Sequence, residues 1–130
     1  MLHYKIRTIK SLKDQKVKYY PAVANLRVMK FKDIIEHIVA RTHLTSPDVV
    51  GGAQALSSAV SNYLRQGRRV KLGELGSFYL GVRATEGMAE KEKVTANNIK
   101  NVRCRYLASS EMKKSLATSL VGFKKREEKQ

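Results

Sequence analysis

The sequence predicts an α+β fold, and three observations support this prediction. Apolar and polar residues alternate with a period of two near the N-terminus and again between residues 69 and 106, as is typical of half-buried strands. Between residues 31 and 64 the apolar residues instead follow helical spacing. A short helical pattern follows the last strand.

The N-terminal segment predicts two strands. Residues 3–10, "HYKIRTIK", and residues 16–24, "KVKYYPAVA", are separated by the polar stretch "SLKDQK". Pro21 has no N–H to donate to a ladder, so it belongs at an edge or a strand end. We therefore expect residues 1–30 to form a β-hairpin extension, one use of which is to cover a sheet edge.

Two helices are expected next. Helical spacing begins near Phe31, and a second, longer helix starts after the stretch "THLTSPD". Thr45 or Ser46 can cap this second helix, and Asp48 suits the positive end of its dipole. Gly67 is expected just past its end. The apolar stripe of the second helix is broad enough to pack against more than one neighbour.

A three-stranded antiparallel sheet follows. Two strands, "RRVKL" and "SFYLGVR", flank a turn that Gly73 and Gly76 bracket, and residues 99–106 form the third strand. Residues 84–98 between them have little apolar content and mixed charge, and they predict a flexible excursion between the second and third strands.

The C-terminal part is expected to hold a short helix and a tail. Ser109 or Ser110 can cap the helix, which would contain Met112 and Leu116. Residues 121–130 are highly charged and are expected to be disordered.

The charge balance indicates a polyanionic partner. The 26 Lys and Arg against 11 Asp and Glu give a formal net charge of +15. Nucleic acid is the first candidate and an anionic membrane the second. The sequence has no apolar run of the roughly 20 residues that span a bilayer and no secretory h-region, so we expect a cytoplasmic protein with no membrane partner.

Cations gather on one side of the predicted sheet. The outward positions of the three strands carry Arg69, Lys71, Arg83, Arg103 and Arg105. A single strand with a charged outer face is usually just solvated, but here the outer positions of three strands are almost all positive. Such a face is suited to phosphate contacts, which position a protein without reading base sequence.

Catalytic and metal chemistry find no support in the sequence. Cys104 is the single cysteine, and the three histidines lack metal-ligand spacing. No nucleophile–base pairing emerges. We therefore expect no enzyme activity, no cofactor, no metal site and no small-molecule substrate.

The order of these parts resembles the HU and integration host factor family of histone-like proteins. The resemblance spans Phe31 to Leu116 and is carried by "LTSPDVVGGAQALSSAVSNYLRQGRRVKLGELGSFYLGVR". In "GELGSF", Gly76 and Phe78 match the family's turn, and Leu75 takes the place of its aromatic residue. The N-terminal strands and "VTANNIKNVRCRY" are similar to a divergent HU-like branch of Bacteroidetes.

The resemblance implies an HU-like domain over residues 31–120 that forms an intertwined homodimer. Paired β-arms would hold double-stranded DNA from its minor-groove side, in a nucleoid-architectural role with sequence-tolerant contacts to the phosphate backbone. The predicted DNA-binding residues are Arg69, Lys71, Arg83, Lys91, Lys93, Lys100, Arg103 and Arg105.

The β-arm departs from the family pattern. It has no proline to wedge between base steps, and Met88 is the apolar residue near its tip. Three glutamates lie beside its lysines. The sequence therefore leaves an alternative open, in which the chain is an HU-like interaction or assembly module with weak or lost DNA binding. RNA binding is a third possibility.

Overall fold

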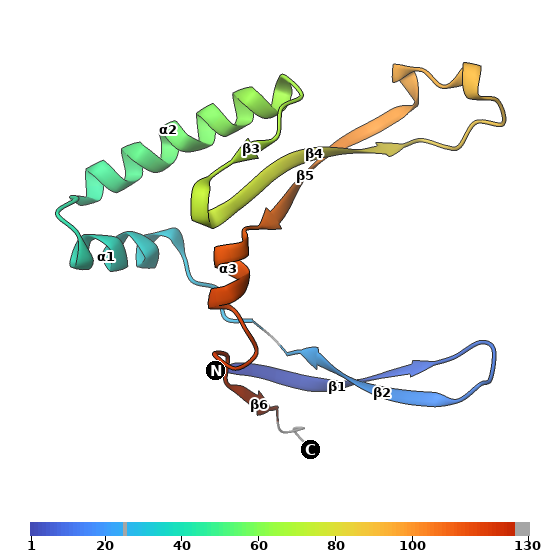
Figure 1. Cartoon of the computed structure of the whole chain (residues 1–130), viewed down its shortest axis with the longest axis horizontal. Coiled ribbons are helices and arrows are strands. Elements are labelled where there is room, and N and C mark those ends of the chain that lie inside the picture. The colour runs from blue at the N-terminus through green and yellow to red at the C-terminus, as the bar shows by residue number, and fades with distance from the viewer. Residues whose placement is uncertain (25, 127–130) are drawn as a thin grey trace. The chain divides into compact units, whose positions relative to one another are not determined.

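The chain folds into two compact units in a computed structural model that describes residues 1–24 and 26–126 (Figure 1). One unit consists of Met1–Ile34 with Ser115–Gln130, and the other of Ile35–Lys114. The second unit is thus inserted between the two segments of the first. This second unit ends at Lys114, whereas the HU-like domain expected from the sequence extends to residue 120.

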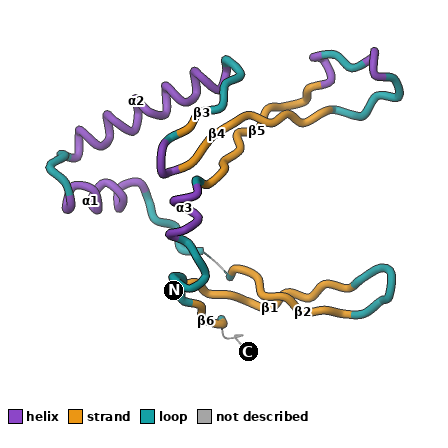
Figure 2. Tube along the Cα trace, viewed as in Figure 1, coloured by secondary structure: helices purple, strands orange, loops and turns teal. Residues whose placement is uncertain are grey.

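The first unit contains a mixed three-stranded sheet. Strand β1 (Leu2–Lys10) pairs antiparallel with β2 (Val17–Val23), and β6 (Phe123–Lys125) pairs parallel on the other side of β1, giving the order β2-β1-β6 (Figure 2). Strands β1 and β2 confirm the predicted hairpin. Pro21 lies in β2 at the edge of this sheet, where its missing N–H breaks no ladder hydrogen bond.

Strand β6 corrects the prediction for the C-terminal end. We expected residues 121–130 to be disordered, but β6 is held against β1, and the Arg126 amide then donates to the Tyr4 carbonyl at 2.8 Å. A three-residue strand has too short a pattern to show periodicity, and its partner is distant in sequence. Residues 127–130 of the predicted tail lie outside the described residues.

The two predicted helices are present as α1 (Phe31–Arg41) and α2 (Ser46–Arg65). Thr45 is the residue that caps α2: its hydroxyl accepts from the Asp48 amide at 3.4 Å, and the Asp48 carboxylate accepts from the Thr45 amide at 2.9 Å. This reciprocal capping box satisfies donors that the first helical turn leaves unpaired. The hydrogen bonds that the Asp48 carboxylate accepts, first from the Thr45 amide and then from the Thr45 hydroxyl at 2.8 Å, lower the pKa of Asp48 below its ordinary value of 3.8.

Helix α2 ends as expected at a glycine. Gly67 has φ of 80°, and its amide donates to the Leu64 carbonyl at 2.9 Å. This left-handed conformation costs a glycine little and stops the helix.

The second unit also contains the predicted antiparallel sheet, with the order β3-β4-β5. Its strands are β3 (Val70–Lys71), β4 (Gly76–Ala84) and β5 (Ile99–Ala108). Strand β3 is shorter than the alternation of "RRVKL" suggested. A 3₁₀ turn, η1 (Gly73–Leu75), connects β3 to β4.

The turn between β3 and β4 is fastened to the end of β5. The Tyr106 hydroxyl donates to the Leu75 carbonyl, and the Ser109 hydroxyl donates to the Glu74 carbonyl. Ser109 also caps α3 (Ser110–Ser115), because its oxygen accepts from the Met112 amide at 3.0 Å. This helix matches the prediction except that it ends before Leu116.

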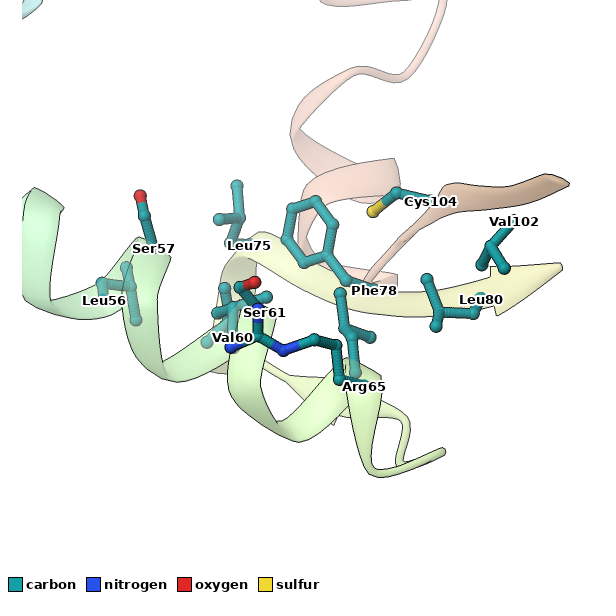
Figure 3. Close-up of a pocket in the computed structure, with 12 residues that line it drawn as sticks. Leu56, Ser57, Val60, Ser61, Arg65, Leu75, Phe78, Leu80, Val102 and Cys104 are labelled. Atoms are coloured by element: carbon teal, nitrogen blue, oxygen red, sulfur yellow. The ribbon is translucent and has the colours of Figure 1, made fainter.

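Helix α2 and the sheet face each other across an apolar groove of about 770 Å³ (Figure 3). In the described part of the chain, Leu64 and Ala24 are the apolar side chains that are buried, and neither is completely enclosed. By contrast, Leu56 on α2 is 48% exposed and Leu80 on β4 is 38% exposed, although both line the groove. The single chain therefore leaves much of its main apolar surface open.

Candidate nucleic-acid interface

The pairing of β3, β4 and β5 sorts their side chains onto two faces. Paired residues project to the same side of a sheet, and the side alternates along each strand. Phe78, Leu80, Val102 and Cys104 line the groove in front of α2 (Figure 3). The residues between them therefore project to the opposite side, away from α2.

That opposite side collects four of the predicted DNA-binding residues. In the strand register Lys71 is paired with Ser77, Arg105 with Tyr79, Arg103 with Gly81, and Arg83 with Asn101, so all eight share one side. We call this surface the basic face. Arg69 is also part of it, as the next paragraph explains. Its five cations are all exposed: Arg69, Lys71, Arg83, Arg103 and Arg105.

Arg69 joins the basic face through an aromatic ring. It precedes β3, so the strand register does not place it. Its guanidinium carbon lies 4.7 Å from the centroid of the Tyr79 ring, within the range of a cation–π interaction. Because Tyr79 belongs to the basic face, this stacking holds Arg69 on the same side as the other four cations.

Gly81 makes room for the Arg105 side chain at the centre of the face. A Cβ atom added at Gly81 would lie 2.8 Å from Nε of Arg105, closer than real Cβ contacts allow. The guanidinium of Arg105 therefore lies across a position that has no side chain of its own. A glycine inside a strand often marks such a close approach.

The cations of the basic face are not neutralised by the protein. Among the described residues, the ion pair present joins Lys93 to Glu90, at 3.8 Å, and both belong to the arm. Glu74 lies in the η1 turn rather than on the strands of the face. The positive potential of the face is thus available to a polyanion.

The other three predicted DNA-binding residues are not brought onto this face. Lys91 and Lys93 lie in a 3₁₀ turn, η2 (Lys91–Lys93), within the arm beyond the ends of β4 and β5 (Figure 1). Lys100 is the extra residue at an irregularity, because Ala84 pairs with Ile99 while Arg83 pairs with Asn101. The register assigns Lys100 to neither face.

The arm contains local hydrogen-bonded structure that its composition did not indicate. After η2 comes a second 3₁₀ turn, η3 (Ala96–Asn98), which Thr95 starts: the Asn98 side chain accepts from the Thr95 amide at 2.7 Å. The Thr85 amide donates to the Asn98 carbonyl at 2.9 Å and closes the base of the arm. Met88, the expected apolar residue near the tip, is half-buried.

Two residues of the face carry more structure than the sequence revealed. The stacking of Tyr79 with Arg69 was not expected from the sequence, and neither was the room that Gly81 leaves for Arg105. Both depend on cross-strand register, which alternation along one strand does not fix. The sequence did carry one signal for these two roles. Tyr79 and Gly81 occupy outward positions of a predicted strand, and the neighbouring predicted strand has arginines at its own outward positions.

Sites of other kinds are not found in the described residues. No group of three or more His, Cys, Asp or Glu side chains is placed to hold a metal ion in residues 1–24 and 26–126. Within the same residues, none of the helices has the length and apolar character needed to cross a bilayer.

Comparison with solved structures supports the fold. A solved structure from Bacteroides vulgatus ATCC 8482, a candidate bacterial DNA-binding protein, has a similar fold, with a TM-score of 0.63 at 12% sequence identity. The alignment covers 95% of this chain and 47% of that one, so this chain spans about half the length of its structural relative. No curated protein matches the sequence.

The family follows from a match that covers almost the whole chain. Residues 1–125 match the model of the HU-HIG family, described as an HU domain fused to a wHTH, Ig or glycine-rich motif. The chain therefore belongs to the HU-HIG family, which confirms the resemblance to HU-like proteins. HU-domain proteins are typically DNA-binding and non-enzymatic.

Proposed function

We propose that the protein binds double-stranded DNA with little sequence preference and has an architectural role in the bacterial nucleoid, in the cytoplasm. The observation that carries this proposal is the basic face, on which four exposed cations from three neighbouring strands share one side of a sheet with Arg69, which precedes β3. Membership in an HU-domain family supports it. Binding of this kind needs no cofactor, because no bond is made or broken.

Phosphate contacts would give the protein affinity for duplex DNA without selecting a base sequence. A cation that neutralises a phosphate releases condensed counterions, so each such cation steepens the log–log slope of affinity against salt by about 0.9. Arginine suits this task because its planar guanidinium can donate two hydrogen bonds to one phosphate. Phosphate recognition needs no base edge, so unrelated duplexes should bind alike.

The proposal extends to the arm. Lys91, Lys93 and Lys100 would add phosphate contacts beyond the sheet, on the minor-groove side of the duplex. The arm has no proline between residues 83 and 99, and Met88 is half-buried rather than projecting. We therefore expect weaker bending than a prolyl wedge would give.

A second copy of the chain is the proposed partner in the groove. The groove is apolar, and it is lined by α2, β4 and β5 of the same unit that carries the basic face. Covering half-exposed leucines such as Leu56 and Leu80 would supply the core that the single chain lacks. A homodimer would also present two basic faces to one duplex.

The proposal is tested by the salt dependence of binding to unrelated duplexes. We expect Lys71→Ala/Arg103→Ala/Arg105→Ala to weaken binding and to make the slope shallower by about 0.9 for each phosphate that is no longer neutralised. The matched control, Arg41→Ala/Lys113→Ala/Lys114→Ala, removes the same charge from helices α1 and α3 and should leave the slope close to that of the natural protein.

Two results would count against the proposal. If the natural protein binds no duplex at low salt, the DNA-binding function is wrong and the assembly-module alternative takes its place. If both triple variants weaken binding equally, net charge rather than the basic face accounts for the affinity. Preference for single-stranded RNA in a direct competition would favour the RNA alternative.

A further inference from the structure

The sheet of the first unit repeats the pattern of the basic face on a different scaffold. In its register Lys5 pairs with Ala22, Arg7 with Tyr20, and Ile9 with Lys18 on the antiparallel side, while His3 pairs with Lys124 on the parallel side. Paired residues share a side, so this side holds His3, Lys5, Arg7, Ile9, Lys18, Tyr20, Ala22 and Lys124. We call this surface the N-terminal basic face.

The opposite side of this sheet is apolar. The register groups Tyr4 with Val23, Ile6 with Pro21, and Thr8 with Tyr19, and Leu2 and Phe123 share that side too. Cations and apolar residues are therefore separated by the sheet, apart from Lys10 and Lys125 on the apolar side and Ile9 and Ala22 on the basic one.

The cations of the N-terminal basic face are exposed and unpaired. Lys5, Arg7, Lys18 and Lys124 are all exposed, and within the described residues none of them has a carboxylate partner. Asp14, the acidic residue of the hairpin, lies in the turn, where its carboxylate accepts from the Lys16 amide at 3.1 Å. The face is thus positive without local compensation.

The spacing of the cations fits an extended polyanion rather than one small anion. Lys124 stands opposite His3 and Lys18 opposite Ile9, six residues apart along β1. At about 3.3 Å per residue the cations cover about 20 Å. One strand of B-DNA carries a phosphate about every 3.4 Å along the axis, so the face matches roughly six successive base pairs.

We propose that the N-terminal basic face is a second surface for the phosphate backbone of duplex DNA, separate from the basic face of β3, β4 and β5. A membrane surface fits less well, because interfacial binding needs a continuous apolar surface to insert, whereas Ile9, Tyr20 and Ala22 are interspersed among the cations on this side. Single-stranded RNA fits less well too, because Tyr20 is the one Phe, Tyr or Trp side chain that the register places on the face, and stacking of successive bases needs more than one large ring.

The test compares two triple variants of the full chain with equal loss of charge. Lys5→Ala/Arg7→Ala/Lys18→Ala removes cations from the N-terminal basic face. Lys10→Ala/Lys13→Ala/Lys16→Ala removes them from the apolar side and the turn of the same hairpin. We expect the first variant to bind duplex DNA with a salt slope shallower by about 0.9 for each phosphate left without its cation, and the second to keep the natural slope. Circular dichroism establishes that both keep the natural fold.

The outcomes separate this inference from the proposed function. If both hairpin variants keep the natural slope, or if both become shallower equally, the inference is wrong while the basic face of β3, β4 and β5 can still bind DNA. If Lys71→Ala/Arg103→Ala/Arg105→Ala has no effect but Lys5→Ala/Arg7→Ala/Lys18→Ala makes the slope shallower, the basic face of β3, β4 and β5 is not the DNA-binding site, and the inference stands. If vesicles of anionic lipid or single-stranded RNA outcompete the duplex for the Lys5-dependent site, duplex DNA is the wrong partner.

Discussion

Gly76 is a position at which the fold has no room for any side chain. Its φ is 131°, outside the range that L residues favour, and an added Cβ would collide with the Leu107 carbonyl and approach the Tyr106 ring to 2.9 Å. The sequence placed Gly76 beside the turn but could not show which of the two bracketing glycines was packed so closely. Gly73 has open space around it.

We expect Gly76→Ala to lower the free energy of unfolding by more than about 1 kcal/mol, since strain at a positive φ adds to a backbone collision. Denaturant unfolding measures this. Gly87→Ala is the matched control, because an added Cβ there meets nothing within 4 Å and its φ is not positive. A change at Gly76 as small as the one at Gly87 would contradict the argument.

Gly81 offers a second prediction at the same scale, and its readout is binding. In Gly81→Ala the new methyl group would displace the guanidinium of Arg105, whose Nε is the closest atom. We expect weaker DNA binding with little loss of stability, because a flexible side chain can move aside. Titration of a labelled duplex measures the affinity, and an unchanged affinity would mean that the placement of Arg105 over Gly81 is unimportant.

At the scale of elements, α2 was the best predicted part of the chain. Its start, its cap and its terminal glycine all follow from local chemistry, since each signal acts within four residues. The prediction left Thr45 and Ser46 as alternative caps, and the reciprocal hydrogen bonds of Thr45 and Asp48 decide between them. Strand β6 is the opposite case, because its pairing with β1 depends on a partner more than 100 residues away.

We expect Thr45→Ala to destabilise the protein by about 1 kcal/mol, because the donors at the start of α2 lose their partner. Thr45→Ser keeps the hydroxyl oxygen and should restore most of the lost stability. Both are measured by thermal unfolding at neutral pH. Equal losses in the two variants would show that the methyl group, not the cap, matters.

The same capping box predicts a pH dependence. Asp48 has a pKa below 3.8 in the folded chain, so its carboxylate stabilises the fold at pH values above its ordinary pKa. That stabilisation is lost as the pH falls below about 4 and through the lowered pKa. Asp48→Asn should therefore lose less stability than the natural protein over this range, and parallel curves of melting temperature against pH would contradict the assignment.

At the scale of the whole molecule, the open groove indicates that one chain does not complete its own core. Chain order and family resemblance allowed the HU-like fold to be predicted, and they implied a dimer. The amount of apolar surface left uncovered could not be predicted, because it depends on the distance between α2 and the sheet. The convergence of the five cations was predicted in outline, since alternation fixes sides once strands are known to be neighbours.

We expect Leu80→Glu to lower the solution mass from twice the chain mass of 14.7 kDa to one chain, because it would bury an unpaired charge in the proposed interface. Light scattering measures the mass. Val94→Glu, in the arm and 60% exposed, is the matched control and should leave the mass unchanged. A monomeric natural protein would remove the proposed dimer.

Strand β6 also has a mechanical consequence. The Leu2 amide donates to the Gly122 carbonyl at 2.7 Å, and β1 and β6 run side by side in the same direction. A tension applied between Met1 and Arg126 would therefore act along these two strands and load their hydrogen bonds in shear, all at once. Until those hydrogen bonds break, Ile35–Lys114 would carry no load. The pairing of β1 with β6 would therefore protect the inserted unit from mechanical unfolding.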